Sequence, residues 1–189
     1  RPVLLLRTHR APETETNDIS AGRFGMPGRS YYVEAFCDAA AAGHTRILRA
    51  LVEEGGVEAG SLSARGRTAL MAAAWEGRME AVRMLVSEWG VDANKANPDT
   101  GATPLHMASH EGHTELARML LSEGGANANQ ATSDTGATPL HIVCQARHTE
   151  LARVLLTEGG ADANQGRTDT GATPLIIASP NGHTESGRA

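Results

Sequence analysis

Apolar residues recur along the chain in groups of three, separated by polar residues. After Thr114, the residues Leu116, Leu120 and Leu121 are spaced i, i+4, i+5, which places them on one face of a helix. The pattern predicts an amphipathic helix that buries a single apolar stripe. Three further segments carry the same stripe, as Ile47, Leu51 and Val52, as Ala81, Leu85 and Val86, and as Leu151, Leu155 and Leu156.

A shorter helix is predicted before each stripe from the letters Thr-Pro-Leu-His. They stand at 103–106 and 138–141, with altered copies at 68–71 and 173–176, so each step is 35 residues. Thr138 can cap a helix through its hydroxyl, Pro139 suits the first helical position, and Leu140 is expected to be buried. A fixed period of this size indicates a stack of repeated helix pairs.

The period also sets the domain organisation. Residues 1–30 show no sustained period, and we expect them to be disordered or loosely ordered, or to form a basic docking tail. In the first repeat the first helix is predicted at 35–42, with Phe36 in the place of Leu105. The repeats are expected at about 31–63, 64–98, 99–133 and 134–168, with a partial repeat at 169–189.

The partial repeat departs from the pattern. Pro180 falls within its first helix, where proline removes a hydrogen bond and clashes with the preceding turn. Ser186-Gly187-Arg188 stands where the leucine stripe should be, which leaves Leu175, Ile176 and Ile177 without an outer-helix partner. Because terminal repeats need a polar outer face, and because the chain begins with Arg1, we expect a truncated or processed chain.

The connections are predicted from their glycines. Asp134-Thr135-Gly136 is typical of a tight turn, since aspartate can bond the backbone that follows it and glycine accepts a positive φ. The second helices end in a double glycine, but Trp89 stands at the first glycine position in the second repeat, so that position does not require left-handed geometry. The left-handed caps are therefore predicted at the second glycine, namely Gly56, Gly90, Gly125 and Gly160.

These motifs resemble ankyrin repeats, which carry Thr-Pro-Leu-His-x-Ala and then Gly-His-x-Glu before a run of leucines. The resemblance covers about residues 31–185 and is strongest in the third and fourth repeats. It implies an all-α ankyrin-repeat solenoid of antiparallel helix pairs with protruding hairpin-like loops. It also implies a concave surface of loop tips and first helices that binds other proteins, without enzymatic activity.

Charge and cysteine content narrow the function further. The net charge of −5 combines +2 in residues 1–30, from five arginines and three acidic residues, with −7 in the remainder. An acidic body disfavours nucleic acid as the partner. The two cysteines, Cys37 and Cys144, show no paired spacing, and no apolar run is long enough to span a membrane. We expect an intracellular, cytoplasmic setting.

Histidines and thiols offer the alternative of an enzyme. His106 and His110 share a helix face at i, i+4, a spacing that can chelate a metal, but no zinc-protease motif follows. His106 and His141 are repeat letters, for which the resemblance implies a hydrogen bond that steadies the loop. Cys37 and Cys144 are expected to be small buried apolar residues. A metal or thiol enzyme is disfavoured, and no cofactor, metal or small-molecule substrate is expected.

Specificity is expected where the repeats differ, at the pair of residues before each Gly-His turn. Trp75 is the best anchor, because tryptophan is enriched at interface hot spots; its alternative is packing against the first repeat. Aspartates 99, 134 and 169, at the loop tips, either form turns or make an acidic ladder for a basic partner. The pairs are Trp75-Glu76, His110-Glu111, Gln145-Ala146 and Pro180-Asn181.

The sequence therefore predicts a non-catalytic scaffold that binds a partner protein on its concave face. Rigid stacking would fix the contact residues in advance and lower the ordering cost of association. The alternative is a targeting or regulatory fragment of a larger protein whose effector domain lies outside this chain.

Overall fold

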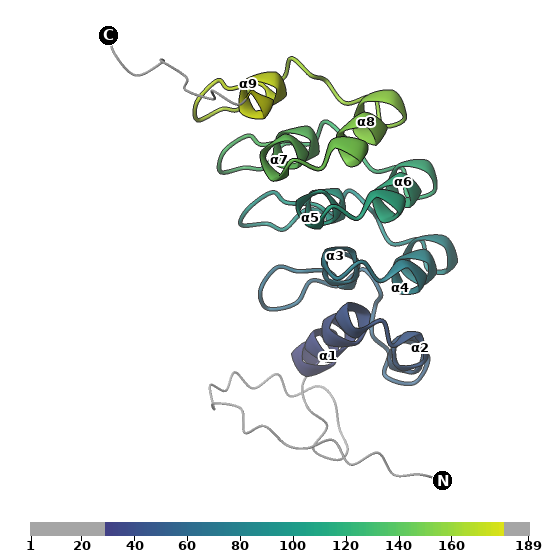
Figure 1. The fold of residues 1–189 in the computed structure, drawn as a ribbon. Coiled ribbons are helices and arrows are strands. Elements are labelled where there is room, and N and C mark those ends of the chain that lie inside the picture. The colour runs from purple at the N-terminus through teal and green to yellow at the C-terminus, as the bar shows by residue number, and fades with distance from the viewer. Residues whose placement is uncertain (1–28, 180–189) are drawn as a thin grey trace.

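The computed structural model describes residues 29–179, and every regular element in that part of the chain is helical (Figure 1). The elements are α1 (Arg29–Ala42), α2 (Thr45–Glu53), α3 (Ala69–Trp75), α4 (Met79–Arg83), η1 (Met84–Glu88), α5 (Pro104–Glu111), α6 (Thr114–Ser122), α7 (Pro139–Ala146), α8 (Thr149–Thr157) and α9 (Pro174–Ala178). The first helices α1, α3, α5, α7 and α9 stack in one layer, and the second helices α2, α4 with η1, α6 and α8 form another. Loops project from the edge of the first layer, so the predicted all-α solenoid is confirmed.

The caps predicted from the repeated letters are present. The Thr68 hydroxyl accepts a hydrogen bond from the Met71 backbone N–H at 3.1 Å. Pro104 and Pro139 begin α5 and α7, and the leucines that follow them are buried. Each first helix is short, with five to eight residues from α3 onward, so its position depends on packing between repeats as well as on its caps.

The first two leucines of the stripe are fully buried in α6 and α8, and Leu121 is half-buried. Leu116, Leu120, Leu151 and Leu155 are all at most 2% exposed. Burial of each leucine stabilises the fold by about 1.5–3 kcal/mol. The core is therefore a row of similar leucine clusters that runs along the stack between the two layers of helices.

At the N-terminal end of the described solenoid, the predicted stripe of α2 is wrong for Ile47 and is only half-buried at Leu51 and Val52. Ile47 is 42% exposed and Leu51 is half-buried, whereas Leu48 is fully buried. The equivalent residues of α6 and α8, Leu116 with Leu120 and Leu151 with Leu155, are buried. No described second helix precedes α2, and its exposed face includes Ile47.

At the C-terminal end of the described solenoid, the last residue of the apolar stripe is exposed. A Cβ built on Gly159 would lie 3.2 Å from Leu121 Cδ1, so the last leucine of the stripe packs against the following repeat. Leu156 is the equivalent residue of α8, and it is 45% exposed because no described second helix follows. The expectation that Leu156 is buried is therefore wrong. Leu175 in α9 is 77% exposed for the same reason.

The second glycine of each helix end is left-handed, as predicted. Gly56, Gly90, Gly125 and Gly160 have φ between 60° and 65°, and Trp89 at the first glycine position has φ −108°. A Cβ on the equivalent Gly124 would lie 2.8 Å from the Leu120 carbonyl oxygen. Trp89 carries such a Cβ, and the turn that leads to it, η1, is a wider π-helix. The wider turn makes room for the Cβ of Trp89. The other repeats have glycine at this position and need no such room.

The first helix begins earlier than predicted. α1 starts at Arg29 rather than at 35, so residues 29 and 30 belong to a helix and not to a loosely ordered segment. Phe36 is buried in the place of a leucine, and its ring centroid lies 6.0 Å from that of Trp89, which packs against the core. Residues 1–28 and the predictions for Pro180, Asn181 and Ser186-Gly187-Arg188 lie outside the described residues.

Candidate protein-interaction surface

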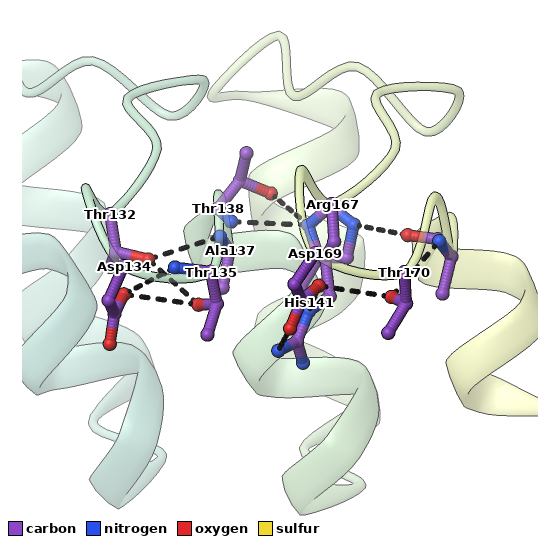
Figure 2. Close-up of polar contacts among 10 residues, drawn as sticks. Thr132, Asp134, Thr135, Ala137, Thr138, His141, Arg167, Asp169 and Thr170 are labelled. Atoms are coloured by element: carbon purple, nitrogen blue, oxygen red, sulfur yellow. Dashed lines mark hydrogen bonds and ion pairs between the residues drawn. The ribbon is translucent and has the colours of Figure 1, made fainter.

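His106 and His141 link each loop to the helix after it and to the next repeat. Nδ1 of His106 accepts hydrogen bonds from the Thr103 backbone N–H at 3.1 Å and from the Thr103 hydroxyl at 2.8 Å. Its Nε2 donates to the carbonyl oxygen of Ala137 at 3.1 Å. His141 repeats this arrangement with Thr138, as Figure 2 shows, and its Nε2 donates to the carbonyl oxygen of Ala172 at 3.0 Å. The loop-steadying role that the resemblance implied is confirmed.

This network is compatible with a neutral imidazole that carries its proton on Nε2. His106 is 2% exposed, and burial lowers the pKa of its imidazole to about 4. Burial also lowers the pKa of His141. Both nitrogens of His106 are already bonded, so it does not share a metal with His110, whose ring is exposed. Within residues 29–179 there is no group of three or more metal-ligating side chains.

A second set of side chains, at the start of each second helix, ties successive repeats together. His113 Nε2 donates to the Trp75 carbonyl oxygen at 3.0 Å, and His148 Nε2 donates to that of His110 at 3.1 Å. Arg78 takes the same place in the second repeat, and its Nε donates to the Ala41 carbonyl oxygen at 2.9 Å. The sequence showed the repeated Gly-His letters but not that the histidine reaches back to the preceding first helix.

These contacts hold the ends of the first helices, where the predicted specificity residues lie. Trp75 and His110 come from α3 and α5, and their rings are stacked with centroids 4.9 Å apart and planes 20° apart. The indole is 37% exposed. Its aromatic partner lies in the third repeat, so the interpretation that Trp75 packs against the first repeat is not supported. The pair forms an aromatic platform that crosses a repeat boundary.

The other predicted residues surround this platform. Glu76 and Glu111 directly follow the two rings, and Glu111 Oε1 lies 2.7 Å from Nδ1 of His110. Gln145 and Ala146 end α7, one repeat further along, and both are exposed. The structure thus brings the Trp75, His110 and Gln145 positions into one row along the first-helix layer.

A hollow of ≈ 440 Å³ lies on the α1 side of this row. We call it the α1–α3 hollow. One wall comes from the helices and carries Glu34, Asp38 and Glu76; the other comes from loop 63–67 and carries Arg65 and Arg67. Sequence reasoning did not identify this site. Its charged residues come from three separate segments of the chain, which the sequence does not show to be neighbours.

The loop tips differ more than their repeated letters suggest (Figure 2). Asp134 accepts a hydrogen bond from the Thr135 backbone N–H at 2.7 Å, and hydrogen bonds from Thr132 and Thr135 lower the pKa of its carboxyl. Asp169 forms an ion pair with Arg167 at 2.6 Å, and hydrogen bonding to Arg167 lowers the pKa of this carboxyl. The turn-forming role is confirmed at Asp134, whereas the acidic ladder stays a prediction.

At Asp99 the turn is made by another residue. Asn97 Oδ1 accepts a hydrogen bond from the Asp99 backbone N–H at 2.9 Å, so the asparagine two positions earlier takes the place expected for the aspartate. Asn97 also donates through its Nδ2 to the Arg65 carbonyl oxygen at 3.1 Å, which joins this loop to the one before it.

Both thiols are at least partly covered by protein. Cys37 is buried beside the Arg67 carbonyl oxygen, at 3.7 Å from Sγ, and burial raises the pKa of its thiol to about 12. Cys144 is half-buried, and burial raises its pKa as well. A raised pKa disfavours the thiolate, which is the nucleophilic form.

Paired helices, outward loops and histidine-linked repeats define a helical-repeat solenoid. The family described as ankyrin repeats (3 copies) matches residues 36–132 and 124–188, and the chain belongs to this family. Ankyrin repeats generally mediate protein–protein interactions and are typically non-enzymatic. A sequence comparison with curated proteins gives no match. Among the described helices, none has the length and apolar character needed to cross a membrane.

Proposed function

We propose that this chain binds a partner protein through the row of first-helix ends, with Trp75 and His110 at its centre. The observation that supports this most directly is the exposed stack of two aromatic rings from different repeats. Exposed tryptophans contribute large contact areas and are enriched at hot spots. The scaffold is non-catalytic, and Glu76, Glu111, Gln145 and Ala146 form the rest of the contact row.

The same stacking supports binding with little rearrangement. The Trp75 backbone carbonyl is held by His113, and its ring is held by His110. A side chain that is ordered before binding loses less conformational entropy when the partner arrives. The loop-tip residues Asp99, Asp134 and Asp169 flank this row along the edge of the layer, where a partner could contact them.

Tryptophan fluorescence offers a test, because the chain contains two tryptophans. In a Trp89→Phe background, Trp75 is the only indole. Binders selected from a displayed library of protein fragments should protect it from acrylamide quenching and shift its emission. Trp75→Ala combined with His110→Ala should weaken the same binders, while helical circular dichroism stays unchanged.

The matched control is Ile47→Ala, which removes an exposed apolar side chain from the second-helix layer. It should leave binding as in the unmodified chain. Binders that tolerate loss of both rings, or that leave Trp75 fully open to quenching, would show that the interaction surface lies elsewhere. Loss of helicity in the double variant would mean that these residues act in folding.

A further inference from the structure

We infer that the apolar run Val3-Leu4-Leu5-Leu6 packs against the N-terminal end of the solenoid, in a hollow between α1 and residues 57–64. The inference concerns an interaction within the chain and is independent of the proposed function. It gives this end of the stack an apolar cover, which terminal repeats need in some form because they lack a neighbour.

The hollow has a volume of ≈ 390 Å³, and we call it the N-terminal hollow. Its lining comes from Ser30 and Val33 of α1 and from residues 57–58 and 61–64, which follow α2. Val33 and Val57 are buried, whereas Leu62 is 38% exposed. An apolar occupant would remove the exposed part of this leucine from water, which is favourable.

Leu62 departs from the pattern of the other loops. Each loop closes through a backbone hydrogen bond from one N–H to a carbonyl four or five positions later; the donors are Ser63, Asn97, Thr132 and Arg167. The residue before the donor is Leu62 in the first loop and a small residue in the others, namely Ala96, Ala131 and Gly166. The closure of the loop therefore does not require a leucine, and a large apolar side chain at the hollow indicates a contact made there.

The connections that follow the second helices are joined to one another along the stack. Lys95 Nζ donates to the carbonyl oxygen of Gly60 at 2.8 Å, and the Asn127 backbone N–H donates to Oδ1 of Asn94 at 2.7 Å. Each bond joins one connection to that of the next repeat. Within residues 29–179 no such connection precedes residues 57–64, so this one has a described partner on one side only.

The run at residues 3–6 is suited to this place by its composition and its position in the chain. It is the longest run of large aliphatic residues in the sequence, since the others have at most three. Residues 7–28 tether it to Arg29, whose neighbour Ser30 lines the N-terminal hollow. A tether of this kind gives an effective concentration of about the millimolar range, which a separate partner would have to exceed.

The segment at the other end of the sequence is a poorer candidate. Residues 180–189 contain no valine, leucine, isoleucine, methionine or aromatic residue. They follow α9, which lies at the opposite end of the stack from α1 (Figure 1).

The charges on the two sides have opposite signs. Among the described residues that line the N-terminal hollow, Glu58 alone is charged, and its exposed carboxylate has no ion pair within residues 29–179. Arg1, Arg7 and Arg10 flank the run at residues 3–6. The α1–α3 hollow carries both signs, whereas the single sign here is complementary to a basic segment.

The expected population of the packed state follows from two opposing effects. Burial of two leucines favours packing by about two to four orders of magnitude. Closing a tether of 22 residues costs about two orders of magnitude. The packed state should therefore predominate by about tenfold, and loss of one apolar contact should bring the two states close to balance.

Hydrogen exchange of the 189-residue chain, followed by mass spectrometry, tests this packing. Residues 3–6 should exchange about tenfold more slowly than in the same chain unfolded in urea. Leu62→Lys should remove this protection, because it replaces the apolar contact by a charge that repels the flanking arginines. The matched control, Leu175→Lys, makes the same change at an exposed leucine of α9 and should retain the protection. Protection of α5 to α8 should be unchanged in both variants.

Disulfide trapping locates the contact. In a Cys144→Ser background, Leu4→Cys or Leu5→Cys is combined with Leu62→Cys and equilibrated in a glutathione redox buffer. At least one of the two combinations should form a disulfide within one molecule, whereas the same residues combined with Leu175→Cys should not. Cys37 is buried and should stay reduced.

Each contrary outcome overturns the inference. Residues 3–6 could exchange as fast as in the unfolded chain, or be protected equally in the two lysine variants. A disulfide formed chiefly between molecules would assign the hollow to a second copy of the chain, and pairing with position 175 would place the run at the other end. Binders that depend on Trp75 test the proposed function separately, so its failure is distinguishable from these results.

Discussion

Acidification is expected to destabilise the stack through the buried imidazole of His106. Protonation would place a hydrogen on Nδ1, which already accepts bonds from the N–H and hydroxyl of Thr103. The pKa of His106 is lowered from 6.5 to about 4, so the unfolded chain takes up a proton at a higher pH than the folded chain. The stabilisation is therefore complete above about pH 6.5 and is lost as the pH falls towards 4.

The magnitude follows from the pKa difference. One pKa unit corresponds to about 1.4 kcal/mol, so His106 should remove about 3 kcal/mol from the free energy of unfolding by pH 4. His141 acts in the same direction, because its pKa is also lowered by burial. Asp134 and Asp169 have pKa values below 3.8, so their stabilisation is lost only at lower pH. Between pH 7 and 4.5 the two buried histidines should dominate these four groups.

Urea unfolding followed by circular dichroism, at pH values between 7.5 and 4.5, measures this loss. His106→Gln can keep bonds to Thr103 and Ala137 without titrating, so its stability should fall less steeply than that of the unmodified chain. His110→Gln removes an exposed histidine of the same helix and should retain the full loss. An NMR titration that finds the His106 ring protonating near 6.5, or equal pH slopes for His106→Gln and the unmodified chain, would refute the reasoning.

Three further predictions concern stability and order. Arg147 has φ 63°, whereas α1, α3 and α5 are followed by a glycine with positive φ, so Arg147→Gly should raise stability by about 1 kcal/mol in thermal melting. Gly112→Ala should lower stability by more, because its Cβ would lie 2.7 Å from the His148 ring. Leu48→Ala should cost about 2–5 kcal/mol and Ile47→Ala much less; equal losses in urea unfolding would contradict the observed burial. In hydrogen exchange the third and fourth repeats should exchange most slowly, since their leucine layers are the most fully covered, and faster exchange in α6 than in α2 would contradict this.

Much of the candidate surface could be located from the sequence, because departures from a repeat are visible in the letters themselves. Trp75 and His110 stood out at the same repeat position, and the structure places them in contact. The direction in which the indole leans could not be predicted, since it depends on the side chain opposite it in each neighbouring repeat. On the α1 side the equivalent residue is Ala41, which has no ring, and on the α5 side it is His110. The aromatic partner of Trp75 therefore lies on the α5 side.

The sequence by itself determined the elements within one repeat. The threonine cap, the proline start and the left-handed second glycine each depend on residues a few positions apart, so local chemistry was sufficient to predict them. It also determined the stacking, because a 35-residue period leaves each helix pair with an apolar face that only another pair can cover.

Only the tertiary structure decided what depends on neighbouring repeats. That Leu48 rather than Ile47 is buried in α2 depends on how this end helix packs, which the repeated pattern does not specify. The α1–α3 hollow exists because loop 63–67 folds over α1, for example where Cys37 lies beside the carbonyl of Arg67, 30 residues later in the chain. Periodicity shows that such surfaces meet, but their charges and shapes arise from side chains on both sides of the contact.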